Sequence, residues 1–258
     1  MATKIPGFFW YDVTTRDPKA AAAFYSSVMG WAAQDSGVPG QTYTIFSKGP
    51  NPIGGLMSFP EGSPPTGVQS CWTGYIGVDD VDAYTKRVKA AGGAIHREPW
   101  EIPGVGRFAI VADPQGAVFM LMRGFSDQPP PQVAANTPGH VAWHELHADD
   151  PAKAFAFYAD LFGWTKGEAM DMGPGGIYQL FKFGGGEPVG GMMTRTPDAP
   201  GSFWLYYFQV EALGAALARV TAGGGKICSE PHQVPGDAWI APCLDPQGGA
   251  FALVADKR

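Results

Sequence analysis

Apolar and polar positions along the chain follow two periods, one typical of helices and one typical of strands. Val81, Tyr84 and Val88 form one apolar stripe at helical spacing, which predicts an amphipathic helix. We expect the first half of the chain to run strand, helix, two strands, and then strand, helix, three short strands. The expected strands are 8–14, 42–47, 53–59, 72–78, a segment around Ala94, 107–111 and 118–122, and the expected helices are 18–29 and 81–91.

The same sequence pattern occurs twice along the chain. Residues 17–31, DPKAAAAFYSSVMGW, reappear as residues 150–164, DPAKAFAFYADLFGW. In both segments an aspartate stands at the N-cap, a proline follows at the first helical position, and a glycine stands where a helix ends in the left-handed conformation. The two segments therefore predict equivalent helices, and Leu213, Leu217 and Val220 mark the counterpart of the second helix.

Further short matches keep nearly the same spacing in both halves. They are GGLM at 54–57 with GGMM at 190–193, EP at 98–99 with 230–231, PG at 103–104 with 235–236, and DPQG at 113–116 with 245–248. Three consecutive prolines at 129–131 indicate a stiff linker between the copies. We predict an α+β fold with a first domain at 1–123, a proline-rich linker at 124–138 and a second domain at 139–258.

Composition narrows the possible partners. The formal net charge of −6 is spread without long runs, so we expect neither nucleic acid nor a membrane as a partner. The three cysteines are widely spaced and form no Cys-x-x-Cys pair, which argues against both a disulfide framework and a thiolate metal site. The first residues contain no apolar stretch typical of a signal segment, so the expected location is the cytoplasm.

The FY-x-x-x-x-GW helix after an Asp-Pro cap, the DPQG turn before the last strand and the element order together resemble the vicinal-oxygen-chelate (glyoxalase, bleomycin-resistance and dioxygenase) superfamily. The tandem form also resembles actinobacterial proteins loosely described as hydroxylases. The resemblance implies two domains, each with paired βαβββ-type modules wrapped around a cleft. It further implies that the two copies pair within one chain, so we expect a monomer containing an intrachain pseudo-dimer.

The resemblance also implies where metal ligands would stand. In metal-dependent members a His or Gln precedes the capping aspartate by seven residues, a second ligand lies on the strand before the second helix, and a glutamate follows the DPQG aspartate by seven residues. Imidazole and carboxylate groups suit divalent metal ions as ligands, whereas indole and aliphatic groups do not. We therefore expect no metal and no cofactor, because those positions hold Trp10, Thr73 and Met120 in the first copy and Trp143, Leu205 and Ala252 in the second.

Strand alternation selects the side chains that share a face with the two tryptophans. Asp12 lies two residues after Trp10 and Glu145 two residues after Trp143, so each carboxylate is expected beside an indole. Burial in such a place disfavours the ionised form, which suits a general acid or base. The alternative is a carboxylate satisfied by backbone N–H groups or water.

Three histidines stand near the start of the second copy. His147 is expected on the face of Glu145, whereas His144 is expected to point toward the helices and His140 to lie near the strand start. Glu145 and His147 suit an acid–base pair or a poor two-point metal site, and a surface histidine at a cleft rim is the alternative. The predicted catalytic residues are Asp12, Glu145 and His147.

Aromatic side chains dominate the predicted binding surface. Indoles at repeated positions suit stacking on a flat ligand. Arg107 of the first copy is replaced by Trp239 in the second, so we expect the two clefts to differ. The glycine pairs inside strands are expected to mark a bend or a close backbone approach. The predicted ligand-binding residues are Trp10, Trp143, Tyr75, Tyr207, Thr73, Met120, Gln209, Arg107 and Trp239.

These observations leave several functional hypotheses. The favoured one is metal-independent binding of a hydrophobic aromatic or polyketide-like small molecule in inter-domain clefts, with acid–base conversion as an open extension. One alternative is a metal-dependent glyoxalase-like lyase or dioxygenase with relocated ligands. Another is a non-catalytic, drug-sequestering resistance protein, and a scaffold with no small-molecule role is the last. Whether the protein is an enzyme stays open.

Overall fold

The computed structural model describes residues 6–38, 42–59, 69–126, 134 and 136–258, so the predicted proline run at 129–131 lies outside it. In the first copy the helix predicted at 18–29 is confirmed at both ends, and each predicted strand is present. The elements of this copy are β1 Phe8–Thr15, α1 Pro18–Met29, β2 Ala32–Asp35, β3 Tyr43–Lys48, β4 Asn51–Ser58, β5 Cys71–Gly77, α2 Val81–Ala90, β6 Ala94–Ile102, β7 Gly106–Ala112 and β8 Val118–Gly124.

The second copy repeats this order with shorter strands near its end. Its elements are β9 Val141–Ala148, α3 Pro151–Phe162, β10 Thr165–Asp171, the short 3-10 helix η1 Gly173–Gly175, β11 Ile177–Lys182, β12 Gly190–Thr194, β13 Phe203–Gln209, α4 Leu213–Ala222, β14 Lys226–Ile227, β15 His232–Gln233, β16 Trp239–Leu244 and β17 Ala250–Ala255. None of the helices in the described residues is long and apolar enough to cross a membrane.

Both sheets have the same strand order. The first is β2-β3-β4-β1-β5-β8-β7-β6, and the second is β10-β11-β12-β9-β13-β17-β16-β14, with β15 paired to β16. Parallel pairs such as β1–β4 and β12–β9 combine with antiparallel neighbours such as β3–β4 and β11–β12. The α+β prediction of two tandem copies is therefore confirmed.

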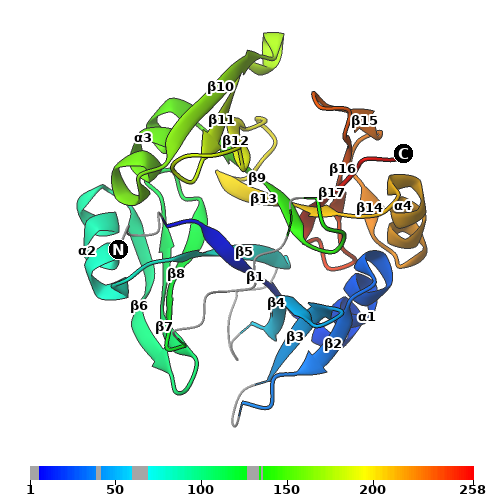
Figure 1. The fold of residues 1–258 in the computed structure, drawn as a ribbon, viewed down its shortest axis with the longest axis horizontal. Coiled ribbons are helices and arrows are strands. Elements are labelled where there is room, and N and C mark those ends of the chain that lie inside the picture. The colour runs from blue at the N-terminus through cyan, green and yellow to red at the C-terminus, as the bar shows by residue number, and fades with distance from the viewer. Residues whose placement is uncertain (1–5, 39–41, 60–68, 127–133, 135) are drawn as a thin grey trace. The chain divides into compact units, whose positions relative to one another are not determined.

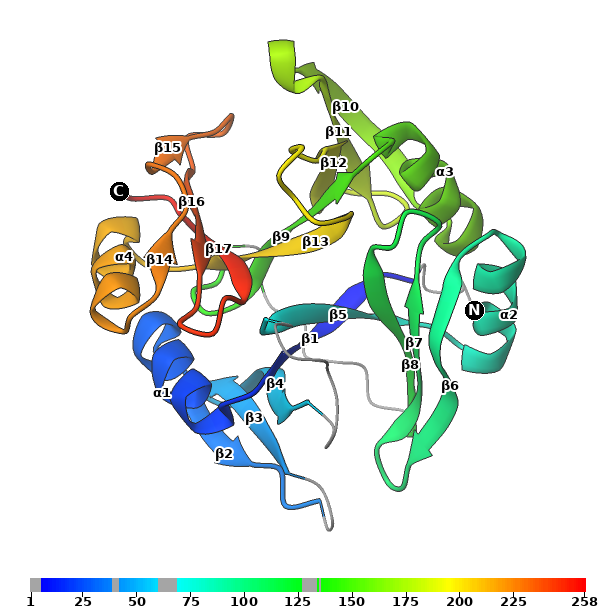
Figure 2. The same ribbon diagram turned by 180° about the vertical axis from the view of Figure 1, so that it is seen from behind.

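The chain divides into two compact units whose limits fall inside β1, β5, β9 and β13. Unit 1 comprises residues 1–10, 74–130 and 143–204, and unit 2 comprises residues 11–73, 131–142 and 205–258. Each unit thus takes one half from each sequence copy. In Figures 1 and 2, α2 lies beside α3 within unit 1, and α1 lies beside α4 within unit 2.

The aromatic core of unit 2 explains why two distant motifs recur together. Tyr25 of the FY motif donates its hydroxyl hydrogen to Asp245 of the DPQG turn at 2.9 Å, and the Trp72 indole donates to the Tyr25 oxygen at 2.9 Å. Tyr25 is fully buried and Asp245 is 3% exposed. Because a buried polar group is costly unless it is hydrogen-bonded, the two motifs depend on each other.

Unit 1 contains the same arrangement with the roles of the copies exchanged. Tyr158 donates to Asp113 at 3.2 Å and accepts from the Trp204 indole at 3.0 Å. The rings of Tyr158 and Trp164 stack with centroids 5.0 Å apart. The tryptophans at 31, 72, 164 and 204 are all buried, so they serve as packing anchors of the two units.

Two predictions about strands were wrong. The expected order places two strands after the first helix, whereas three follow, because β2 and its counterpart β10 were missed. All four residues of β2 are exposed, and β10 is mostly exposed. Edge strands of this kind carry no apolar alternation, so the pattern that identifies strands is absent from them.

The alternation rule also fails at Phe8. Strand alternation places Phe8, two residues before Trp10, on the face of Trp10, but its ring stacks on His144 with centroids 5.0 Å apart and meets Trp204 edge-on. Phe8 is therefore part of the aromatic core of unit 1. Trp10 instead packs against an apolar cluster containing Tyr75, Phe108 and Met120.

Candidate functional site

A hydrogen-bonded network in unit 1 joins one face of β9 to β11. The Trp143 indole N–H donates to the Tyr178 hydroxyl oxygen at 2.8 Å, and the Tyr178 hydroxyl donates to Glu145 Oε2 at 2.7 Å. His147 Nε2 lies 2.8 Å from Glu145 Oε1. Strand alternation predicted that Trp143, Glu145 and His147 share a face, and these contacts bring them together through Tyr178.

The contacts of the network suit an imidazole that donates from Nε2. An ionised carboxylate only accepts hydrogen bonds, so in the neutral tautomer that bonds Glu145 the proton is on Nε2 and Nδ1 keeps a lone pair. Burial and the charge of Glu145 raise the pKa of Tyr178 above its ordinary value, which keeps the phenol a donor. Glu145 is 7% exposed, so hydrogen bonds such as these replace most of its contact with water.

Aromatic rings fix the position of the histidine. The His147 imidazole stacks on Phe203 with centroids 4.6 Å apart and an interplanar angle of 1°. Its side chain keeps 14% of its surface exposed, compared with 10% for Glu145. The arrangement is a histidine oriented by a carboxylate, which suits it to accept a proton at Nδ1.

The glycine pairs predicted to mark a close approach have distinct roles. A Cβ at Gly190 would overlap the His144 carbonyl oxygen, and a Cβ at Gly54 would overlap that of Tyr11. The second glycine of each pair lies under a tyrosine ring, since a Cβ at Gly191 would overlap Tyr178. The close approach is confirmed. The first glycine of each pair lets neighbouring strands pair closely, and the second lets a tyrosine ring pack over the strand.

Unit 2 has a counterpart of the acid–tyrosine contact in this network. The Tyr43 hydroxyl donates to Asp12 Oδ1 at 2.7 Å, and a Cβ at Gly55 would overlap that tyrosine. Asp12 is 2% exposed. Thr14 stands where the second copy has His147, so this acid–tyrosine pair lacks an imidazole at that place.

Three predicted binding residues gather in unit 1. Trp10, Tyr75 and Met120 belong to one apolar cluster, which also contains Trp100. Tyr75 and Met120 are cross-strand partners on β5 and β8. Tyr75 and Met120 are 3% and 7% exposed, so these two residues are part of the hydrophobic core of unit 1.

The remaining predicted residues in unit 2 are more scattered. Tyr207 and Gln209 are 4% and 3% exposed, and the Gln209 Oε1 atom has no hydrogen-bond partner among the described residues. Burial raises the pKa of the Cys71 thiol, and the neighbouring Thr73 side chain opposes this shift. Trp239 is covered by the Arg258 guanidinium, 4.9 Å from the ring centroid.

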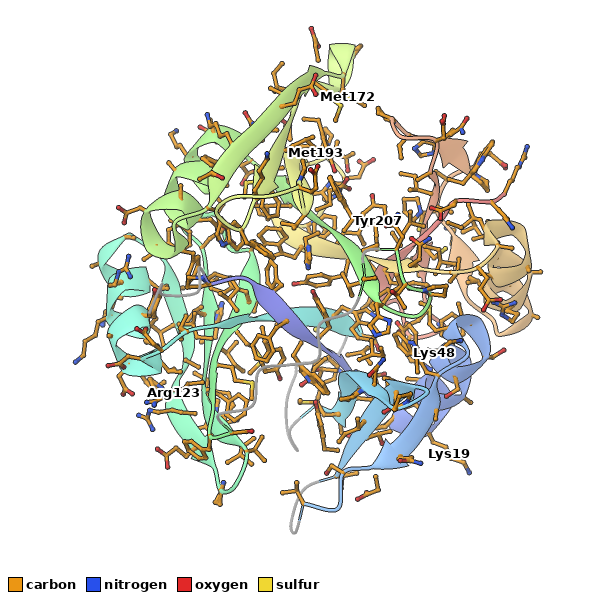
Figure 3. All side chains as sticks on the ribbon, viewed as in Figure 1. Lys19, Lys48, Arg123, Met172, Met193 and Tyr207 are labelled. Carbon is orange, nitrogen blue, oxygen red and sulfur yellow. The ribbon has the colours of Figure 1, made fainter. Side chains whose placement is uncertain are left out.

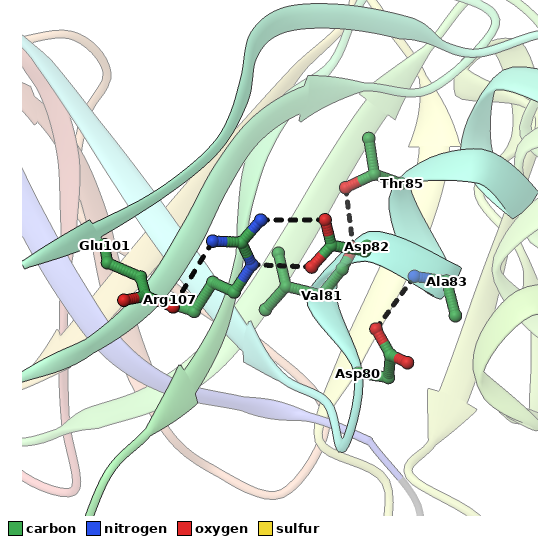
Figure 4. A network of polar contacts seen from close by, with 7 residues as sticks. All are labelled: Asp80, Val81, Asp82, Ala83, Thr85, Glu101 and Arg107. Atoms are coloured by element: carbon green, nitrogen blue, oxygen red, sulfur yellow. Dashed lines mark hydrogen bonds and ion pairs between the residues drawn. The ribbon is translucent and has the colours of Figure 1, made fainter.

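Arg107 takes part in an ion-pair network on unit 1. Its guanidinium contacts Asp82 at 2.5 and 2.8 Å and Glu101 at 3.4 Å (Figure 4). The Arg107 guanidinium lowers the pKa of Asp82. The pairing gives Arg107 a structural role in joining β7 to the first turn of α2.

The side chains at the positions where the resemblance would place metal ligands do not suit a divalent metal ion. Trp143 uses its only ring N–H to bond Tyr178, and Met120 packs in an apolar cluster. Leu205 and Ala252 are aliphatic and buried. Within the described part of the chain, no group of three His, Cys, Asp or Glu side chains is placed to hold a metal ion.

Sequence reasoning missed Tyr43 and Tyr178. Each stands three residues before a buried phenylalanine, Phe46 or Phe181, and the resulting Tyr-x-x-Phe pattern recurs in both copies ahead of the glycine pair. This repeat is the signal that identifies both tyrosines. Their role as partners of the acids follows only from the register of β3 and β11.

Comparison with known proteins gives two matches to one family model. The model of the Glyoxalase/Bleomycin resistance protein/Dioxygenase superfamily matches residues 7–121 and 137–253. The chain is 34% identical over 247 residues to CFP32 of Mycobacterium tuberculosis, a protein that bears the name glyoxylase, with 95% of this chain and 93% of that protein covered. It is 31% identical over 258 residues to the anthracycline biosynthesis protein DauV of a Streptomyces species, covering 95% and 91%.

Solved structures agree on the fold. The Mn(II)-bound glyoxalase from Novosphingobium aromaticivorans superimposes with a TM-score of 0.66 at 16% identity, covering 99% of this chain and 83% of that one. The 2,3-dioxygenase LapB from a Pseudomonas species gives a TM-score of 0.66 at 13% identity, covering 99% and 93%. At these identities the likeness concerns the fold alone.

Proposed function

Because the chain belongs to the Glyoxalase/Bleomycin resistance protein/Dioxygenase superfamily, we propose that it binds a hydrophobic aromatic or polyketide-like small molecule at the Trp143–Tyr178–Glu145–His147 network, without a metal ion. The single observation that carries the proposal is the imidazole held by Glu145 at 2.8 Å beside an indole and a tyrosine. In unit 2 the Asp12–Tyr43 pair is the matching place for a ligand hydroxyl or carbonyl group.

The proposed chemistry is transfer of a proton between the ligand and His147 Nδ1. When Nδ1 accepts a proton the ring becomes a cation, and the carboxylate of Glu145 stabilises that charge across the Nε2 hydrogen bond. Tyr178 stabilises the carboxylate by donating to its other oxygen. The network therefore acts as an acid–base pair.

The ligand class rests on the aromatic surroundings and on one relative. Trp143 and Phe203 flank the network, and indole and phenyl faces favour stacking on flat rings, worth about 0.5–1.5 kcal/mol for each pair. The name of DauV places that protein in anthracycline biosynthesis. Carried over to this chain, the ligand is a flat polycyclic aromatic compound with ionisable hydroxyl or keto groups.

The test is a titration of the protein with a tetracyclic anthracycline aglycone, followed by tryptophan fluorescence and by calorimetry. We expect one ligand per network, and we expect Trp143→Ala to weaken binding about tenfold because the indole face and its hydrogen bond are lost. His232→Ala, a change at an exposed histidine, is the matched control for His147→Ala. Binding that is equal in wild type and in the Trp143 and Glu145→Gln variants would overturn the proposal.

A further inference from the structure

A cavity of about 320 Å³ lies entirely within unit 2, at the C-terminal end of α1. This volume is at the small end of the range for ligand sites, so it suits a metabolite of modest size. Its lining combines charged side chains with apolar ones: Lys48, Arg219, Glu211, Met29, Pro138 and Val210. None of these residues belongs to the Glu145 network.

The charged groups of the cavity are not neutralised by one another. Arg219 donates to the Val28 carbonyl oxygen at 2.9 Å, and Lys48 Nζ lies 3.3 and 3.4 Å from the carbonyl oxygens of Met29 and Gly30. Within the described residues, neither cation has a carboxylate within 4.0 Å, and Glu211 is exposed and forms no ion pair there. Two cations and one carboxylate therefore face the cavity with bonding capacity to spare.

The corresponding positions of unit 1 carry aromatic rings. Lys48 corresponds to Phe183, which packs on Trp164 at 5.0 Å and on His144 at 5.7 Å between ring centroids. Met29 corresponds to Phe162, whose ring stacks on Tyr84 at 5.6 Å and 3°. The changes in unit 2 replace one buried ring and one partly buried ring by flexible side chains and leave a polar cavity.

Lys48 adds a charge that unit 1 does not have at the corresponding place. In unit 1 the arginine that corresponds to Arg219 is Arg87, which donates to the Asp160 carbonyl oxygen near the end of α3 at 2.9 Å. Phe183 donates nothing there. The lysine on β3, labelled in Figure 3, is therefore an addition specific to the cavity of unit 2.

We infer that this cavity binds a small zwitterion of amino-acid size, whose carboxylate meets Lys48 and Arg219 and whose ammonium group meets Glu211. Charge-assisted hydrogen bonds of this kind are about twice as strong as neutral ones, and opposite charges at two ends of a ligand fix its direction. Met29, Pro138 and Val210 provide an apolar wall for the ligand's side chain.

The experiment compares L-leucine with its two half-charged analogues by isothermal titration calorimetry at low ionic strength. 4-Methylpentanoate lacks the ammonium group, and 3-methylbutylamine lacks the carboxylate. We expect one L-leucine per chain, with each analogue bound at least tenfold more weakly. No leucine binding up to its solubility limit, or 4-methylpentanoate binding as tightly as leucine, would overturn the inference.

Variants separate the site from general charge effects. Glu211→Gln should weaken L-leucine at least tenfold and leave 4-methylpentanoate unchanged, because it removes only the partner of the ammonium group. Asp79→Asn changes the corresponding exposed acid of unit 1 and is the matched control, expected to bind leucine as wild type does. An equal loss in both variants contradicts the inference.

A second variant fills the cavity. Lys48→Phe combined with Met29→Phe introduces the residues that unit 1 has at these positions, and it should abolish leucine binding. Circular dichroism and thermal unfolding show whether this variant is folded, and Glu211→Gln keeps the test decisive if it is not. Leucine affinity retained in the folded double variant would contradict the assignment.

Discussion

At the scale of single residues, the acid on the first strand of each copy is a fixed hydrogen-bond acceptor. Asp12 and Glu145 were predicted from alternation beside the tryptophans, and both accept a tyrosine hydroxyl at 2.7 Å. Tyr43 comes from a strand that the sequence placed correctly, and Tyr178 comes from the counterpart of that strand in the second copy, but the sequence does not reveal the register of either strand. Pairing across strands depends on tertiary contacts, which the period of one strand does not contain.

The close contact between the Tyr178 ring and Gly191 gives a first prediction. Gly191→Ala should move the tyrosine away from Glu145, lower the free energy of unfolding by about 1–3 kcal/mol and weaken ligand binding, because the new Cβ overlaps the ring. Gly185→Ala, at a glycine with open space around it, is the control. Urea unfolding measures the difference in stability between the Gly191→Ala and Gly185→Ala variants. Equal midpoints would show that the Tyr178 ring does not pack closely on Gly191.

Buried His144 gives a prediction about acid. Burial lowers the pKa of His144 from 6.5 to about 4, and its Nδ1 lies 2.8 Å from the Val189 carbonyl oxygen. As pH falls, the His144 imidazole is protonated in the unfolded chain at a higher pH than in the folded chain. The stabilisation by neutral, buried His144 is therefore present above pH 6.5 and is lost as pH falls toward 4. The loss is about 3 kcal/mol.

His144→Phe tests this sign directly. The ring remains stacked on Phe8, and the titrating group is removed. Between pH 6.5 and 4 the stability of the variant should fall less steeply than that of the wild type, as measured by chemical unfolding at several pH values. Parallel pH profiles would mean that His144 does not titrate with unfolding.

At the scale of elements, the repeated motifs are linked pairs. The FY tyrosine on α1 meets the DPQG aspartate that precedes β17, and the tyrosine on α3 meets the aspartate that precedes β8. The sequence predicted both motifs and both helices. It did not predict their pairing between copies, because Tyr25 and Asp245 are 220 positions apart.

This linkage predicts a large cost for Tyr25→Phe. The change leaves the Trp72 N–H and an Asp245 oxygen without their buried partner, so we expect a loss of about 1–3 kcal/mol in unfolding free energy. A double-mutant cycle with Asp245→Asn should show strong coupling. Tyr84→Phe, in which the ring stack on Phe162 is kept, serves as the control. Additive effects of Tyr25→Phe and Asp245→Asn would contradict the linkage.

At the scale of the whole molecule, each compact unit contains one half of each sequence copy. Composition and repeats predicted two domains in tandem, with boundaries at 1–123, 124–138 and 139–258. The division into units follows from contacts such as α1 with α4 and α2 with α3, which sequence periodicity does not report. The boundaries remain a prediction about separable segments of sequence.

The exchanged halves predict how isolated copies behave. Residues 1–126 expressed alone should not form a stable monomer, because Tyr25 and Asp113 lose partners located in the second copy. We expect dimers or aggregates by light scattering, and a 27.4 kDa monomer for the full chain. A folded, cooperative monomer of residues 1–126 would contradict the exchanged arrangement.

At the centre of the proposed function, the Glu145–His147 network binds an aromatic ligand without a metal ion. The most direct measurement is calorimetric titration of the anthracycline aglycone into protein treated with a chelator and checked by elemental analysis, for wild type, Glu145→Gln and His147→Ala. We predict one-to-one binding by the metal-free wild type, at least tenfold weaker binding by both variants, and no change on adding Mn²⁺ or Zn²⁺. Binding that appears only when a divalent ion is restored would contradict the account.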